Sequence, residues 1–230
     1  MSALNIPLPR EQLERVVRQI VRQRFAEALQ AGVPRLSVAY TPNLVVNVSA
    51  RHMHLSGQDL KTLFGDEAEL TVFRWLYQPG EFASEQAVTV IGPRRRMIEN
   101  VRILGPLRGR SQLEISATDA VALGIDAPLR PSGKIEGTPG CLLLGPKGAL
   151  DMREGVIRAE RHVHMTPADA QFYGFTDRQY VKLRVDSDCA ATFERVLCRA
   201  DPKFLMEVHL DTDEGNACNL VNATAVELLA

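Results

Sequence analysis

The sequence predicts a mainly β protein with a few short helices, arranged as barrels or sandwiches and preceded by an amphipathic helix. Two observations predict the β class: nine short runs rich in β-branched residues follow Pro34, and Gly and Pro residues separate them. A third observation, an internal repeat, indicates two related halves. With 230 residues, 45% of them apolar, the chain can form two compact units with separate cores.

The first expected element is an amphipathic helix over residues 10–29. Apolar side chains such as Leu13, Ile20 and Phe25 recur at helical intervals, with arginines between them. Gly32 and Pro34 end the pattern, so residues 1–34 are expected to be joined to a separate body. Two interpretations stay open: the helix packs on that body, or it docks onto a partner protein.

The body is expected to contain strands at nine runs of four to seven residues. Each run is too short for a typical helix and is bounded by turn-forming residues. The runs are residues 44–48, 70–76, 87–91, 101–104, 141–144, 156–159, 180–185, 192–198 and 204–210.

The repeat carries histidines. Arg51-His52-Met53-His54-Leu55-Ser56 recurs 110 positions later as Arg161-His162-Val163-His164-Met165-Thr166, and each copy is followed by an acid, Asp59 or Asp169. Ser or Thr three residues before an acid is a variant of the capping box at a helix start. Each His-x-His strand end should therefore run directly into a capped helix.

The same frame occurs twice more, with Glu114 ahead of Ser116 and with His209 ahead of Asp211. Four strand-to-helix corners therefore present a candidate ligand at one local position. Together with the first histidine of each pair, they use all five histidines of the chain. The predicted metal ligands are His52, His54, Glu114, His162, His164 and His209.

Histidines one residue apart on a strand point to the same side, while Met53 or Val163 between them points into an apolar layer. Imidazole and carboxylate suit Zn²⁺ or a similar ion, and six such groups can hold two ions with positions left open for substrate. One His-x-His pair alone is more typical of hydrogen-bonded strand histidines. The duplication of the pair favours metal binding.

Two arginine-rich turns are candidates for binding phosphate. The turn at residues 105–110 lies just before Glu114, which favours Arg108 or Arg110 as an oxyanion-binding residue. Arg94, Arg95 and Arg96 have no such neighbour and could lie on the surface or contact the phosphates of a nucleotide cofactor.

Charge and composition argue against other classes. A net charge of -1 offers no general attraction to nucleic acid. No apolar run approaches the length that spans a bilayer, and no secretory signal is evident, so we expect an intracellular protein with no membrane partner. Its four cysteines have no zinc-knuckle spacing and are expected to be reduced and mostly buried.

The sequence resembles the zinc-dependent phosphate propanoyltransferases of bacterial microcompartments, the PduL type, over nearly the whole chain after Pro34. The matching motifs are residues 46–56, 101–108, 114–116 and 160–165. The resemblance implies two β-barrel domains capped by short helices, with the first strand joining the C-terminal barrel. The implied domains are residues 36–50 with 160–230, and residues 51–159, after the helix of residues 1–34.

The resemblance also implies an activity: reversible transfer of a short acyl group between coenzyme A and phosphate at a dinuclear zinc site between the domains. The substrates would be acyl-CoA, acyl phosphate and inorganic phosphate, and the same six residues match metal ligands while Arg108 matches a phosphate-binding arginine. The implied location is the bacterial cytoplasm, inside a microcompartment. The N-terminal helix would contact shell or core proteins, and self-association into a homo-oligomer is expected.

Two other functions fit the histidine pattern. A dinuclear metal hydrolase would use similar ligands to activate water, although a His-x-His-x-Asp-His continuation is missing. A non-catalytic interaction module would use the metal only for stability.

Overall fold

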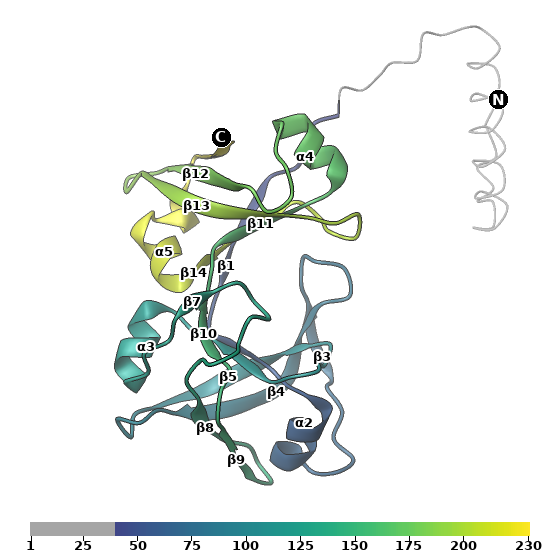
Figure 1. The fold of residues 1–230 in the computed structure, drawn as a ribbon, viewed down its shortest axis with the longest axis vertical. Helices are drawn as coiled ribbons and strands as arrows, with labels where there is room; N and C mark the ends of the chain where they lie inside the picture. The colour runs from purple at the N-terminus through teal and green to yellow at the C-terminus, as the bar shows by residue number, and fades with distance from the viewer. Residues whose placement is uncertain (1–39) are drawn as a thin grey trace, which may run out of the picture. The chain divides into compact units, whose positions relative to one another are not determined.

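The computed structural model describes residues 40–230, and β-strands dominate this part of the chain. They form two sheets, each curled into a half-barrel, together with four short α-helices and one 3-10 turn (Figure 1). The predicted mainly β class is therefore confirmed. The predicted amphipathic helix at residues 10–29 lies outside the described residues.

One sheet has six strands in the order β1-β14-β11-β13-β12-β15. Strand β1 lies parallel to β14, and β11 lies between an antiparallel neighbour, β14, and a parallel one, β13. The strands are β1 (Val45–Ser49), β11 (His162–Met165), β12 (Tyr180–Asp186), β13 (Ala191–Ala200), β14 (Glu207–Asp211) and β15 (Ala225–Leu229).

The other sheet has nine strands in the order β7-β10-β6-β2-β5-β4-β8-β9, with β3 paired to β4. The strands are β2 (His52–His54), β3 (Val72–Trp75), β4 (Phe82–Ile91), β5 (Met97–Gly105), β6 (Gln112–Glu114), β7 (Leu129–Arg130), β8 (Cys141–Leu144), β9 (Ala149–Met152) and β10 (Val156–Ala159).

The same four-strand arrangement occurs in both sheets. Strand β2 lies between antiparallel β6 and parallel β5, just as β11 lies between β14 and β13. Beyond them, β10 is parallel to β6 as β1 is parallel to β14. Each His-x-His strand therefore follows, in sequence, a strand that belongs to the opposite sheet, and the two halves are related as the repeat predicts.

The division into domains at residues 36–50 with 160–230, and 51–159, stays a prediction. The strand pairing is compatible with it, because β1 pairs with strands of the C-terminal segment while β2 to β10 form the nine-stranded sheet.

Each sheet covers its own apolar core. Met53, Ile103 and Leu113 are fully buried in the core of the nine-stranded sheet. Val163 and Val208 are fully buried in the core of the six-stranded sheet. Because side chains alternate along a strand, the residues on either side of these apolar ones must point to the opposite face.

Four helices follow four strand ends, as the repeated frame predicts. They are α2 (Gly57–Phe64), α3 (Ala117–Leu123), α4 (Pro167–Tyr173) and α5 (Thr212–Ala217), and the 3-10 turn is Leu220–Asn222. The side chains of Ser56, Ser116, Thr166 and Asp211 each accept a hydrogen bond from the backbone N–H three residues on. These bonds satisfy N–H groups that a helix start leaves without partners.

No helix among residues 40–230 is both long and apolar enough to cross a membrane.

The cysteines are free, and three of them, Cys141, Cys198 and Cys218, are buried while Cys189 is exposed. Burial, with a smaller effect of Asp151, raises the pKa of the Cys141 thiol to about 12. Burial likewise raises the pKa of Cys198 to about 11, with a smaller effect of Asp177. These thiols therefore stay protonated in the folded protein well above the usual thiol pKa of 9.0.

A loss of stability at alkaline pH follows. Above about pH 9 the unfolded chain releases these protons and the folded protein keeps them, so the free energy of unfolding falls as pH rises. For Cys141 the slope approaches about 1.4 kcal/mol per pH unit. Urea unfolding at pH 8 and pH 10 under reducing conditions measures the effect. The double variant C141A/C198A should show a flatter pH dependence, and Cys189→Ser an unchanged one; equal slopes in all three proteins would contradict the explanation.

Candidate active site

In the nine-stranded sheet, strand register places three of the predicted ligands on one face. His52 lies directly opposite Glu114 across the antiparallel pair β2 and β6, and His54 lies opposite Gln112. Residues opposite each other in neighbouring strands share a face, so all four polar side chains stand on the side away from Met53 and Leu113. Alternation of side chains along each strand, together with the pairing register of β2 and β6, therefore brings the first candidate ligand group together on one face.

The six-stranded sheet repeats this placement. His162 lies opposite His209, and His164 lies opposite Glu207, across the antiparallel pair β11 and β14. Asn47 of β1 lies beside His209 on the outer side of β14. The second candidate group therefore has a carboxylate next to its three histidines.

The corner helices are tied to the histidine strands by arginine side chains. Arg51 Nε donates to Asp119 Oδ2 at 2.8 Å, and Arg161 Nε donates to Glu214 Oε1 at 2.6 Å. Each arginine directly precedes a His-x-His pair, and each acid lies in the first turn of the helix that follows the neighbouring antiparallel strand. The two ion pairs thus hold adjacent corners in register.

In the first group, the ligand atoms of His52, His54 and Glu114 lie within 4.8 Å of one another, and all three residues are buried. Glu114 Oε2 is 3.6 Å from His52 Nε2, and Glu114 Oε1 is 4.0 Å from His54 Nε2. These separations are too long for hydrogen bonds. Ser132 Oγ and Gln112 Nε2 instead donate to Glu114 Oε1, at 2.6 and 2.5 Å, and fix the carboxylate.

In the second group, the ligand atoms of His162, His164 and His209 also lie within 4.8 Å of one another. The rings of His162 and His209 stack with centroids 4.7 Å apart. The ring of His164 stacks on Phe204 with centroids 4.1 Å apart. Ser49 Oγ lies 3.1 Å from His209 Nδ1.

Two ring orientations are fixed by backbone oxygens. His52 Nδ1 lies 2.8 Å from the Ala50 carbonyl, and His162 Nδ1 lies 2.9 Å from the Glu160 carbonyl. A carbonyl oxygen can only accept, so Nδ1 of each ring carries a proton and Nε2 is the atom left to bind a metal. This is how histidine ligands of metals are commonly oriented.

The donor atoms fit a metal ion on two further observations. Both ring nitrogens of His164 are buried without a hydrogen-bond partner among the described residues, which is costly unless something else binds them. Burial, then the charges of His52 and Arg108, lowers the pKa of His54 to about 3. Burial, then the neighbouring histidines, lowers the pKa of His164 to about 2, so both rings are neutral at pH 7.

The carboxylate of the first group is ionised. Burial alone would raise the pKa of Glu114, but His52, His54, the Ser132 hydrogen bond and Arg108 outweigh it and lower the pKa. Two imidazoles and one carboxylate form a donor set that zinc accepts.

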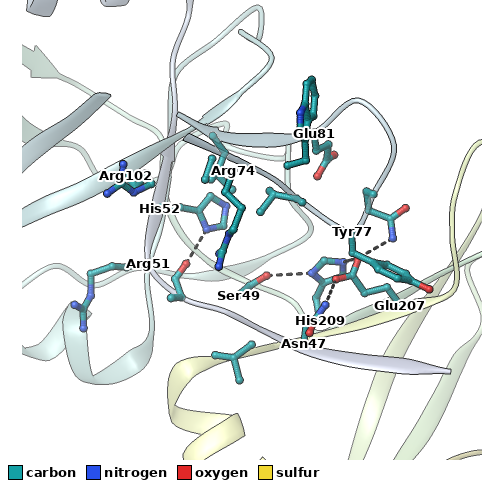
Figure 2. Close-up of a pocket in the computed structure, with 17 residues that line it drawn as sticks. Asn47, Ser49, Arg51, His52, Arg74, Tyr77, Glu81, Arg102, Glu207 and His209 are labelled. Carbon is teal, nitrogen blue, oxygen red and sulfur yellow. Dashed lines mark hydrogen bonds and ion pairs between the residues drawn. The ribbon is translucent and has the colours of Figure 1, made fainter. Parts of the chain in front are cut away.

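The two groups meet at shared cavities. A small cavity is lined by Glu114 from one sheet and by His162 and His209 from the other. A larger pocket, about 580 Å³, is lined by both His52 and His209, which point into it from the two sheets in Figure 2. Any molecule that fills this pocket lies beside both ligand groups.

The arginine candidates separate clearly. Arg108 is half-buried, its backbone N–H donates to the Leu55 carbonyl at 2.9 Å, and its Nη1 donates to Ser132 Oγ at 3.1 Å, one hydrogen bond away from Glu114. Arg110 is exposed and paired with Glu136 and Glu154. Of the two arginines left open by the sequence, Arg108 lies at the ligand groups and Arg110 does not.

The arginines at residues 94–96 lie elsewhere. Arg94 Nη1 donates to the Val121 carbonyl at 2.9 Å, next to helix α3, and all three arginines are exposed. Among the two interpretations of this turn, the structure favours a surface position.

Several polar residues of the site were not predicted. Glu207 is buried and accepts hydrogen bonds from Asn47 Nδ2 at 2.6 Å and Gln78 Nε2 at 2.7 Å, and its Oε2 lies 3.2 Å from His209 Nε2. Gln78 also bonds to both backbone groups of Leu205. Glu207 could have been found, because it lies two positions before His209 on a strand; Gln78 carries no sequence signal.

This chain is similar to known proteins of one family over most of its length. The family described as phosphate propanoyltransferase matches residues 45–221. A phosphate propanoyltransferase of Planctopirus limnophila is 47% identical over 224 residues, covering 96% of this chain and 92% of the relative. One of Thermotoga maritima is 51% identical over 180 residues (78% and 85%), and one of Rhodopseudomonas palustris is 39% identical over 228 residues (96% and 98%).

Proposed function

The chain belongs to the phosphate propanoyltransferase family, and from that premise we propose that it reversibly transfers a short acyl group, propanoyl or acetyl, between coenzyme A and phosphate. Its substrates are then acyl-CoA and inorganic phosphate in one direction, and acyl phosphate and CoA in the other. The observation that carries the proposal is that residues of both ligand groups line the same two cavities, while half-buried Arg108 is linked to Glu114 through Ser132.

We further propose that the site is dinuclear and holds zinc. His52, His54 and Glu114 would hold one ion, and His162, His164 and His209 the other. The donor types, the buried ring nitrogens without partners and the neutral histidines support this assignment. When bound, such ions supply Lewis acidity, which polarises a carbonyl oxygen and favours a thiolate over a thiol.

The pocket shared by His52 and His209 is the proposed place for the thioester end of acyl-CoA. Its volume of about 580 Å³ suits part of such a molecule, and it opens between the two sheets. Arg74, Arg102 and Trp75 line its wall, which gives cations and an aromatic face to a phosphorylated, nucleotide-containing substrate. An acyl group bound there would lie next to both ligand groups.

Arg108 is the proposed phosphate-binding residue. Its guanidinium uses one of five N–H donors on Ser132, so the others are available to phosphate oxygens. Phosphate carries most of its charge when it leaves the acyl carbon or before it attacks it, and an arginine held in place stabilises that charge without reorganisation. Ser132 and Gln112 hold Glu114 still while this happens.

One assay of the purified, metal-containing protein separates the proposed function from its rivals. Release of free CoA thiol from propanoyl-CoA or acetyl-CoA should require inorganic phosphate and should yield the acyl phosphate. Thiol release at the same rate without phosphate would indicate the hydrolase. A protein that loses metal and unfolds with no turnover under any condition would be the interaction module.

For residues 1–34, which lie outside the described residues, we propose a role in encapsulation. The apolar stripe of Val16, Val17, Ile20 and Val21 would dock onto shell or core proteins of a bacterial microcompartment in the cytoplasm, and would promote self-association.

Deletion of residues 1–34 should leave the specific activity within about twofold of the full chain, because all six proposed ligands and Arg108 lie in the body with its two cores. Residues 1–30 fused to a soluble reporter should co-assemble with shell proteins, and a fusion carrying V17E/I20E should not. An insoluble or inactive truncated protein would show instead that the helix packs on the body.

A further inference from the structure

Arg199 stands on the same face of the six-stranded sheet as the second ligand group. It lies directly beside His164 in the parallel pair β11 and β13, and paired neighbours share a face. The preceding residue, Cys198, is fully buried in the apolar core on the other face. The Arg199 side chain therefore lies on the same face of the sheet as the side chains of Glu207 and His164.

The Arg199 guanidinium has no hydrogen bond or ion pair within the described part of the chain. Its one recorded contact is with the Phe204 ring, whose centroid lies 5.9 Å from the guanidinium carbon. The same ring stacks on His164. Phe204 therefore contacts both His164 and Arg199. This contact leaves the five N–H donors of Arg199 without a hydrogen bond to the described residues.

Arg199 is also half-buried, which makes an unpaired cation costly. Burial, followed by the charges of Arg178 and Arg108, lowers the pKa of this guanidinium, although Glu114 and Glu81 act in the opposite sense. Arginine nevertheless remains protonated at neutral pH. Arg108 lies between strands β5 and β6 of the nine-stranded sheet and acts electrostatically on Arg199, so guanidiniums from both halves of the body face the same region.

We propose that Arg199 is a second phosphate-binding residue, which together with Arg108 holds the transferred phosphate group from both sheets. This inference rests on the proposed function. A phosphate dianion would satisfy the unused donors and balance the two positive charges, which neither Glu81 nor Glu114 does by direct contact with Arg199. The group it binds is the phosphate that enters or leaves the acyl carbon, not the phosphates of coenzyme A.

The test is steady-state kinetics of the full-length, metal-containing enzyme with Arg199→Gln and Arg199→Lys. For Arg199→Gln, the KM for inorganic phosphate should rise by about ten- to a hundredfold, as loss of a charge-assisted hydrogen bond predicts, while the KM for acyl-CoA and the metal content stay unchanged. Arg199→Lys should fall between, because it keeps the charge and loses the planar fork. Arg184→Gln, an exposed arginine of β12 paired with Asp186, is the matched control and should match the wild type.

Three outcomes would overturn the inference: an unchanged KM for phosphate, an increase confined to acyl-CoA, or a loss of metal that accounts for the whole effect. If Arg199→Gln does not fold, Arg199→Lys decides. A KM for phosphate that rises while the KM for acyl-CoA stays unchanged supports the inference, and a wild-type KM for phosphate contradicts it, because the planar fork is proposed to bind the phosphate. Failure of the proposed function would look different, because the wild-type enzyme itself would then show no phosphate-dependent thiol release.

Discussion

Removal of divalent metal with a strong chelator should abolish phosphate-dependent acyl transfer, and added Zn²⁺ should restore it. The expected loss is at least about a hundredfold, because Lewis-acid stabilisation is worth several kcal/mol of transition-state energy. Elemental analysis should find about two ions per chain, since two separate groups of three donor side chains exceed the ligands of one closed zinc site.

Glu114→Gln tests the same claim through a single side chain. The amide keeps the shape of the carboxylate and removes its charge, so we expect a lower metal content together with a loss of turnover. Glu136→Gln is the matched control, because that acid is exposed and paired with the exposed Arg110. Full activity in chelator-treated protein that contains no transition metal would remove the dinuclear proposal and leave the family assignment intact.

Arg108→Ala should depress turnover on the order of a hundredfold and weaken phosphate binding, while the metal content stays near that of the wild type. The guanidinium is proposed to contact phosphate, and its one side-chain hydrogen bond reaches Ser132 and not a ligand atom. Kinetics in both directions, with elemental analysis of the same preparation, measure the two effects separately.

Arg110→Ala is the control for this experiment, because Arg110 is exposed and bound to Glu136 and Glu154. It should behave like the wild type. An active Arg108→Ala with an inactive Arg110→Ala would contradict the assignment, and two normal variants would mean that neither arginine binds phosphate.

Much of the site followed from local patterns. His52 and His54 share a face because side chains alternate along a strand, and Met53 between them is fully buried. The cap residues Ser56 and Thr166 start helices where the frame predicts, since capping depends on residues three positions apart. Such regularities require no knowledge of distant parts of the chain.

The strand boundaries show the limits of the same reasoning. The predicted run at residues 87–91 is the end of a longer strand, β4, which begins at Phe82. Its first half includes the polar stretch Ser84-Glu85-Gln86, which carries no β-branched signal. Pairing of Ser84 with β3 and pairing with β5 on both sides of the stretch hold it extended, so tertiary hydrogen bonding outweighed local propensity there.

Sequence by itself determined the β class, the four capped corners and the six candidate ligands, because each depends on spacings of two to four residues. Tertiary structure alone decided which charged groups join them. Arg108 rather than Arg110 reaches Ser132, Gln78 reaches Glu207 across 129 positions, and Arg199 stands beside His164 without an ion-pair partner in the described body. Those contacts depend on the register of strands far apart in the chain, which no local spacing encodes.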